Sequence, residues 1–416
     1  MTTADMGQES SRLTIDDQRQ PAPSPSGLDL CVFPGGGEMG VLMREFDWRS
    51  TPLGAVEEWP QSLRTSFSIC LASRFPIVLY WGPEFVVLYN DAYGQILGAK
   101  HPWALGQTCH SCWAEIWDTI GPMLNGVVQT GAATWSDDLL LMLERFGYPE
   151  ECYFSFSFSP IQVESGAIGG IFTAVIETTE KVIGERRLRT LRDLAARAVT
   201  ATSEEEGWLT AAATLSENRK DVPFAILCKV KEDRLQVVGT SGITSTHPVC
   251  QELSRSNSDL EGKALQAARF GENIEVDLTA WAQELPCGPW DAPANTALLL
   301  PIAGIGQGCS GILVAAVSPA KALDESYRTF FSLMARQIAT SIADARSYEL
   351  ERQRAEALAE LDRAKTGFFG NISHELRTPL TLLLGPTESA LASKDRALRG
   401  ADLEMVHRNE LRLLKL

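Results

Sequence analysis

The clearest pattern of apolar and polar positions lies near the C-terminus of the chain. Apolar residues recur there at spacings of four and three, at Phe368, Ile372, Leu376, Pro379 and Leu383. This spacing is typical of one buried face of a helix. His374 lies two residues from both Ile372 and Leu376, so at about 100° per residue its side chain points away from that face. The pattern predicts an exposed imidazole on a rigid helix, which Pro379 should bend just after the histidine.

The helical pattern extends on both sides of His374. Upstream, residues 336–365 contain no Gly or Pro, which predicts an unbroken helix leading into the site. Downstream, the pattern continues over 381–391, a turn is expected at 393–395, and a second amphipathic helix begins at 402. Two such helices bury their apolar stripes by pairing with a second copy, as in a four-helix bundle. Because the apolar pattern runs to Leu416 without a helix-ending residue, we also expect a truncated chain.

Short runs typical of strands fill the first half of the chain. They fall at residues 76–80, 85–89, 134–141, 151–160 and 169–178. Asn90 predicts the cap of a helix between the second and third runs. Within the fourth run, residues 152–159 alternate between aromatic and hydroxyl side chains, so one face of that strand is aromatic. Such a face is either ordinary core or the wall of a cofactor site.

A second set of strand-like runs follows at residues 224–230, 234–240, 296–301 and 312–317, with a closing helix at 327–345. An apolar stripe on a charged background predicts a connecting helix over 179–198.

Composition excludes several classes of function. The 416 residues carry a formal net charge of -16, which argues against broad nucleic-acid binding and against docking on an anionic membrane. The polar N-terminus does not resemble a signal peptide. The uncharged run 295–318 contains Pro301 and several glycines, which suit two buried strands and a turn better than a membrane-spanning helix. Nine irregularly spaced cysteines fit reduced thiols, so we expect a soluble cytoplasmic protein.

Two short motifs suggest chemistry that their surroundings do not favour. The sequence Cys109-His110-Ser111-Cys112 could bind a metal, but no second ligand pair has a matching spacing. The run from Gly306 to Gly311 matches Gly-x-Gly-x-x-Gly, yet a strand-like run follows it, whereas a dinucleotide site needs a helix N-terminus there. We expect no metal site, and a hairpin turn at the glycines.

The residue types around His374 suit phosphoryl transfer. Thr378 lies within about 40° of His374 on the helical wheel and three residues from Glu375, so the three side chains share one face. A neutral imidazole is a competent nucleophile toward phosphorus, and an adjacent carboxylate can hold its tautomer and accept its proton. A lone helical histidine is usually only solvated, so the surrounding sequence decides between the two interpretations.

The segment Ser373-His374-Glu375-Leu376-Arg377-Thr378-Pro379-Leu380 closely resembles the phosphoacceptor box of sensor histidine kinases. The resemblance implies that His374 accepts the γ-phosphoryl group of ATP and that Glu375 is the base or orienting group. It implies that Thr378 places a water for dephosphorylation of a response regulator. ATP and Mg would be bound by a separate domain that is absent from this chain, so the chain alone would be a phosphorylation substrate without kinase activity.

The upstream units resemble sensor modules. The sequence Tyr89-Asn90-Asp91-Ala92-Tyr93 and the closing run 176–180 are similar to those of PAS domains, and the second set of strands resembles a GAF domain. The cysteine motif of flavin-binding relatives is absent, and neither His101 nor His110 lies in a haem-selecting pattern. No Cys-His pair of the phytochrome kind is present, so the sensor ligand is unknown.

These interpretations predict an α+β multidomain protein: PAS-like and GAF-like antiparallel sheets with flanking helices, then a helical hairpin that forms a four-helix bundle as a dimer. The predicted boundaries are a disordered tail at 1–40, an N-terminal helical segment at 41–74, a PAS-like domain at 75–180, a linker helix at 181–202, a GAF-like domain at 203–345, a coiled coil at 346–365 and an incomplete phosphoacceptor domain at 366–416.

The expected function is that of a sensor histidine kinase in a two-component phosphorelay, acting as a homodimer on a response regulator receiver domain. Nucleic acid and membrane insertion are not expected. Rotation or bending of the coiled coil would carry a change in either sensor to His374. Two alternatives remain: a non-enzymatic sensory dimerisation protein, and a histidine phosphotransfer intermediate that never phosphorylates itself.

Overall fold

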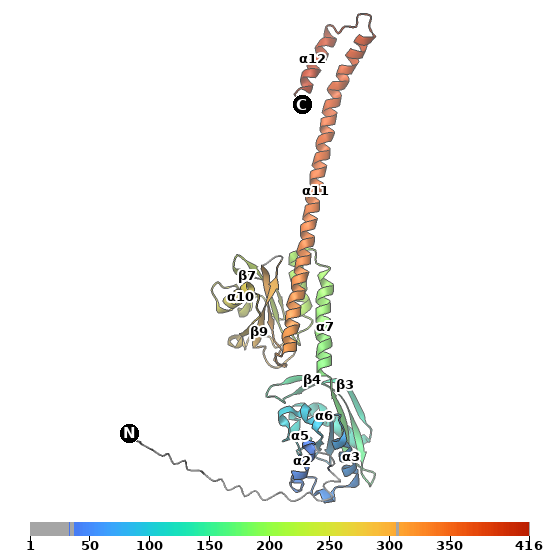
Figure 1. The fold of residues 1–416 in the computed structure, drawn as a ribbon, viewed down its shortest axis with the longest axis vertical. Coiled ribbons are helices and arrows are strands. Elements are labelled where there is room, and N and C mark those ends of the chain that lie inside the picture. Colours follow the sequence, from blue (N-terminus) through green and yellow to red (C-terminus); the bar gives the residue numbers. More distant parts are fainter. Residues whose placement is uncertain (1–32, 34–36, 305–307, 416) are drawn as a thin grey trace, which may run out of the picture. The chain divides into compact units, whose positions relative to one another are not determined.

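The computed structural model describes residues 33, 37–304 and 308–415, and it divides into two compact units at Arg186 and Arg187. Each unit contains one five-stranded antiparallel sheet (Figure 1). The strand order is β2-β1-β5-β4-β3 in the first unit and β7-β6-β10-β9-β8 in the second. The two sheets therefore share one topology. The predicted α+β class with two antiparallel sheets is confirmed.

The first sheet contains every strand that the sequence predicts, with ends shifted by a few residues. Its strands are β1 (Ile77–Trp81), β2 (Val86–Tyr89), β3 (Thr134–Leu143), β4 (Glu150–Gln162) and β5 (Ile168–Glu177). The aromatic residues of β4 alternate into the interior, where Phe154, Phe156 and Phe158 are buried. Phe156 lies opposite Ser136 on β3 and Val175 on β5, so the aromatic face is continuous with the core of the sheet.

Helices cover the first sheet. They are α2 (Glu38–Glu45), α3 (Gln61–Ala72), α4 (Asp91–Leu97), α5 (Cys109–Cys112) and α6 (Trp117–Thr130), with short 3-10 turns η1 (Trp48–Ser50), η2 (Val56–Glu58), η3 (Gly98–Lys100) and η4 (Ala114–Ile116). Asn90 caps α4 as predicted, because its side-chain oxygen accepts a hydrogen bond from the Tyr93 amide at 3.0 Å. The Asn90 Nδ2 also donates to the carbonyls of Cys70, Ser73 and Phe75, which fixes the end of α3 against the sheet.

The N-terminal boundaries differ from the prediction. Helix α2 begins at Glu38, inside the expected tail, because Met39 and Met43 insert into the core. Residues 1–32 and 34–36 of that tail lie outside the described residues. The segment 41–74 is not a separate helical region either. Trp48, Trp59 and Phe67 pack with Phe33 in the same core as the first sheet, so contacts distant in sequence bring this segment into the first unit.

The second sheet consists of β6 (Ala225–Lys231), β7 (Arg234–Ser241), β8 (Ile274–Asp277), β9 (Thr296–Ala303) and β10 (Cys309–Ala316). Four of the strands are predicted by the sequence and β8 is not. Strands β9 and β10 pair antiparallel, so the uncharged run 295–318 forms two strands, as predicted. Residues 305–307 of the glycine motif lie outside the described residues. A strand and not a helix follows the motif, as the sequence predicts.

Helices pack on both faces of the second sheet. On one face, α8 (Glu204–Leu215) and α11 (Glu325–Ala392) share a core with Leu227 of β6. On the other face, α9 (Pro248–Ser254) and α10 (Asp259–Phe270) share a core with Ile226 of β6. A short 3-10 turn, η5 (Thr279–Trp281), follows β8. The predicted connecting helix is α7 (Thr179–Ala198), and the division between the two units falls within it.

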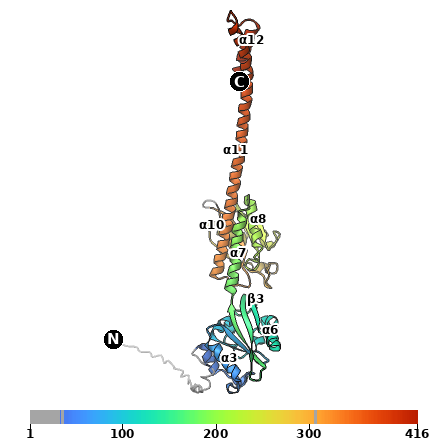
Figure 2. The same ribbon diagram turned by 90° about the vertical axis from the view of Figure 1, so that its right-hand side faces the viewer.

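Helix α11 is a single element of 68 residues, and it confirms the predicted unbroken path through 336–365. It passes through Pro379 and Pro386 without ending. After a turn, α12 (Ala401–Leu413) lies alongside the C-terminal part of α11 in both views (Figure 1; Figure 2). The predicted helical hairpin is therefore confirmed. Among the described residues, no helix combines the length and apolar composition that a membrane-spanning segment requires.

Candidate functional site

His374 lies on the part of α11 that extends beyond the second sheet. The helix begins at Asp324, whose carboxylate accepts a hydrogen bond from the Tyr327 amide at 2.8 Å. Its first turns are held by Tyr327, Phe331 and Ile338, which are fully buried against the sheet. Beyond Ala345 the helix continues without a break into the His374 segment. The site is thus carried by a continuous helix with one end fixed in a hydrophobic core.

The three predicted site residues lie on one exposed face of α11. The side chains of His374, Glu375 and Thr378 are all exposed. The Thr378 Oγ1 donates a hydrogen bond to the backbone carbonyl of His374 at 3.2 Å, which holds the threonine side chain along the helix toward His374. Within the described part of the chain, His374 and Glu375 form no side-chain hydrogen bond or ion pair. The imidazole is therefore accessible to a second molecule.

Helix α12 packs on a different face of α11 from the one that carries His374. Pro379 is the buried residue of α11 at this contact, and Val406 and Asn409 are the buried residues of α12. Five residues separate His374 from Pro379, so their side chains point about 140° apart on the helix. The second helix of the hairpin consequently leaves the imidazole uncovered.

The predicted apolar stripe is not buried within one chain. Phe368 is 61% exposed and Leu376 is 37% exposed, and of the five stripe residues only Pro379 is buried. One additional helix cannot cover both apolar faces of α11, which is the physical reason for the difference. The hairpin also exposes Phe369, Leu380, Leu384, Leu391, Leu403, Leu411 and Leu414, and the stretch of α11 before it exposes Leu358 and Leu361.

The Cys109-His110-Ser111-Cys112 motif forms helix α5, and both thiols are buried. Burial raises the pKa of the Cys112 thiol to about 12 and raises that of Cys109 as well. Since the thiolate is the metal ligand and the nucleophile, these cysteines serve packing better than metal or redox chemistry.

The sequence patterns did not single out Arg145, which is buried among carboxylates in the first unit. Its guanidinium contacts Glu150 at 2.7 Å and Glu177 at 2.8 Å. Burial opposes its charge, but the hydrogen bonds that it donates to Glu177 and Glu150 raise the pKa of Arg145 above its ordinary value. Glu177 belongs to the closing run 176–180, so a search for the partner of that carboxylate could have found Arg145.

Comparison with known proteins places the His374 segment in a defined family. Residues 364–416 match the family model "His Kinase A (phospho-acceptor) domain". The hybrid signal transduction histidine kinase D of Dictyostelium discoideum is 44% identical over 85 residues, which cover 18% of this chain and 6% of that protein. The sensor histidine kinase TmoS of Ectopseudomonas mendocina is 43% identical over 74 residues, covering 17% of this chain and 7% of that protein. The chain thus spans less than a tenth of the length of these curated relatives.

Solved structures resemble the upstream part only distantly. The GAF domain of an Acinetobacter phosphoenolpyruvate-protein phosphotransferase matches with a TM-score of 0.28 at 18% identity, covering 38% of this chain and 94% of that one. The Stigmatella aurantiaca phytochrome photosensory core module matches with a TM-score of 0.32 at 12% identity, covering 83% of this chain and 68% of that one. Scores this low carry no weight for the function of either unit.

Proposed function

From the premise that residues 364–416 form a histidine kinase phosphoacceptor domain, we propose that His374 is the phosphorylated residue of a sensor histidine kinase. The observation that supports this most directly is the exposed face of α11, which carries His374, Glu375 and Thr378 within the matched segment. The other exposed helical histidine of the hairpin, His407, lies three residues from Glu410 and pairs with it at 3.8 Å.

The proposed reaction has two steps. An imidazole nitrogen of His374 attacks the γ-phosphorus of ATP, a N–P bond forms, the bond to the β,γ-bridging oxygen breaks, and ADP leaves. Glu375 accepts the proton that the imidazole loses or holds its tautomer. The phosphoryl group then passes to an aspartate oxygen of a response regulator, with a new O–P bond replacing the N–P bond. Thr378 positions the water that later hydrolyses this acyl phosphate.

The exposed apolar residues of the hairpin support a homodimer. Exposed apolar stripes on two antiparallel helices are buried when a second hairpin packs against them as a four-helix bundle. We propose this assembly for the chain, with ATP and Mg held by a domain outside residues 1–416. The two upstream units would act as sensors whose state reaches His374 through the continuous helix α11.

The test is phosphorylation in trans. The chain is mixed with Mg-ATP and a separately purified histidine-kinase ATP-binding domain, and acid-labile phosphate is measured. We expect label on the wild type and on His407→Gln, and none on His374→Gln. Label on both variants would place the phosphoryl acceptor at a residue other than His374. Absence of label from an intact dimer, with the added domain binding ATP, would favour the non-enzymatic dimerisation protein.

A further inference from the structure

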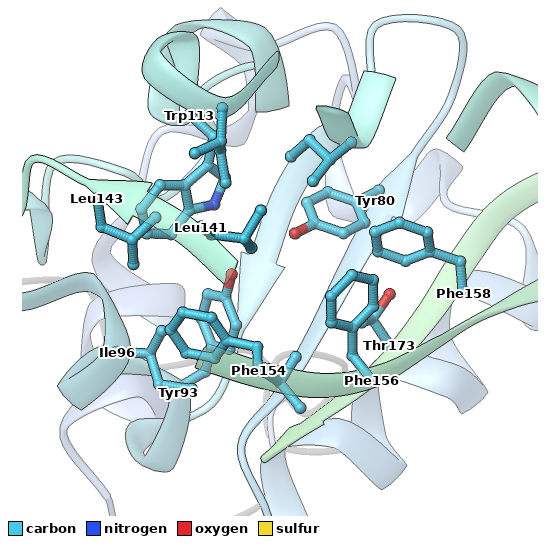
Figure 3. Close-up of a pocket in the computed structure, with 13 residues that line it drawn as sticks. Tyr80, Tyr93, Ile96, Trp113, Leu141, Leu143, Phe154, Phe156, Phe158 and Thr173 are labelled. Carbon is cyan, nitrogen blue, oxygen red and sulfur yellow. The ribbon is translucent and has the colours of Figure 1, made fainter. Parts of the chain in front are cut away.

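A small cavity lies in the first unit, between the sheet and its helices (Figure 3). Its volume is about 40 Å³. Side chains from β1, β3, β4 and β5 and from α4, η4 and α6 form its walls, among them Tyr80 on β1, Thr173 on β5, and the aromatic face of β4. One water needs about 10–15 Å³ of such space, so the cavity accommodates roughly three to four heavy atoms as it stands.

Most polar atoms that face the cavity already have partners. The hydroxyls of Tyr80 and Tyr93 are hydrogen-bonded to one another, and Tyr93 also bonds to the Trp113 side chain. Figure 3 shows these three polar ends directed toward the same space. Burial raises the pKa of both tyrosines well above its ordinary value, so both phenols are neutral. These groups line one side of the cavity without carrying charge.

The hydroxyl of Thr173 is different. Its side chain is 1% exposed, and its Oγ1 has no hydrogen-bond partner among the described residues. Thr173 sits on β5 between the apolar residues Ile171 and Val175, opposite Phe158 on β4. A buried hydroxyl without a partner destabilises a fold. A molecule in the cavity that accepts a hydrogen bond from this hydroxyl removes that cost.

The remaining lining limits what such a molecule can be. Among the described residues that line the cavity, none is charged and none is His, Cys or Met. A charged molecule would lose its hydration without an ion partner there. A haem iron would find no side-chain ligand, and a flavin ring far exceeds the volume. The walls instead are aromatic and aliphatic, which suits an uncharged and mainly apolar molecule.

We propose that this cavity is a binding site for a small, uncharged, mainly apolar molecule with one hydrogen-bond acceptor, of the size and chemistry of a short-chain ketone, held by the Thr173 hydroxyl. The aromatic face of β4 is then the wall of a ligand site as well as core. Any effect of this ligand on His374 rests on the proposed kinase function, but binding itself does not.

Binding is tested on the full chain with acetone as the probe, without ATP. The δ1 methyl groups of isoleucine are labelled with ¹³C, since Ile96, Ile116 and Ile120 line the cavity. We expect saturable shifts of these three signals during an acetone titration. The signal of Ile338, buried in the core of the second unit, should stay unchanged.

Variants at Thr173 separate a specific hydrogen bond from general solvation. Thr173→Val keeps the shape and removes the hydroxyl, so acetone affinity should fall about threefold to tenfold, the worth of one hydrogen bond. Thr173→Ser keeps the hydroxyl and should bind acetone like the wild type. The valine variant should melt no lower than the wild type, because it removes an unpaired buried hydroxyl. The proposal is overturned if the wild type shows no saturable shift, as expected for a cavity that holds only water. It is also overturned if the valine variant binds acetone with the same affinity as the wild type.

Discussion

The hydroxyl of Thr378 donates to the carbonyl of His374, one helical turn before it, at 3.2 Å. This bond holds the hydroxyl close to the helix surface beside the imidazole, at the place where a regulator's phosphorylated aspartate would dock in the proposed reaction. The bond links two exposed residues, so it contributes little to the stability of the helix. The main effect of this hydrogen bond is to fix the position of the Thr378 hydroxyl group.

We predict that Thr378→Val leaves phosphorylation of His374 intact and slows dephosphorylation of the response regulator on the order of 100-fold, the usual effect of removing one positioned hydrogen-bonding group. Thr378→Ser retains the hydroxyl and serves as the control. The measurement is the decay of phosphorylated regulator in the presence of each variant. Equal decay rates for the valine and serine variants would show that the hydroxyl has no role in this step.

A second prediction concerns the exposed apolar face of the hairpin. Leu384 is 53% exposed in one chain, and the proposed dimer buries it. Leu384→Glu should weaken dimerisation about 10- to 100-fold, because burying a leucine contributes about 1.5–3 kcal/mol. Ser389, five residues further on and also exposed, lies about 140° away on the helix, so Ser389→Glu is the matched control. Sedimentation equilibrium gives the dissociation constants, and equal values for both variants would contradict this interface.

A third prediction follows from the burial of two thiols. The pKa of Cys112 is raised to about 12, so at pH 8 only about one molecule in 10,000 carries the reactive thiolate. Iodoacetamide should therefore modify Cys112 and Cys109 only after unfolding, whereas the half-buried Cys287 should react in the folded chain. Peptide mass spectrometry of labelled protein checks this order. Early modification of Cys112 would show that helix α5 opens in solution.

The strands and the long helix were predictable because their signals are local. The alternation along β4 and the absence of Gly and Pro over 336–365 can each be read from residues that are close together in the sequence. Strand β8 was missed because it has four residues and carries Glu275 and Asp277, which resemble a loop. The joining of 41–74 to the first core was also missed, since Trp48 and Trp59 meet their partners only after folding.

Of the two candidate sites, the His374 site could be predicted from local sequence and the cavity beside Thr173 could not. His374, Glu375 and Thr378 share one helix, so their common face follows from residue spacing alone. The cavity beside Thr173 depends on side chains from several strands and helices and on the space they leave between them. No sequence period describes that space. The aromatic alternation of β4 indicated one wall of it, and the threonine between two apolar residues of β5 was the only other local sign.

A fourth prediction concerns the buried guanidinium of the first unit. Arg145→Ala removes the buried guanidinium that donates to Glu150 and makes a bidentate contact with Glu177. Breaking a buried ion pair from one side costs about 3–5 kcal/mol, so the free energy of unfolding of this unit should fall by that amount. Lys181→Ala removes the exposed pair with Asp138 and should cost far less, because solvent screens the attraction between exposed charges. Urea unfolding followed by tryptophan fluorescence compares the two, and similar losses would show that the Arg145 cluster contributes no more than a surface pair.

The last prediction concerns the continuity of α11 between the second sheet and His374. Ala355 is exposed in the middle of this stretch, so residues inserted after it change the helical phase of His374 without disturbing a core. Two inserted alanines rotate the downstream helix by about 200°, whereas seven return it to within about 20° of its original phase. If the second unit controls the phosphoacceptor through the phase of this helix, the two-residue insertion should change the rate of His374 phosphorylation in trans by about fivefold or more. The seven-residue insertion should restore the original rate, although it moves His374 further along the axis. Equal rates in both insertions and the wild type would show that the hairpin works independently of helical phase, and a loss of helicity in either one, seen by circular dichroism, would identify a broken helix as the cause.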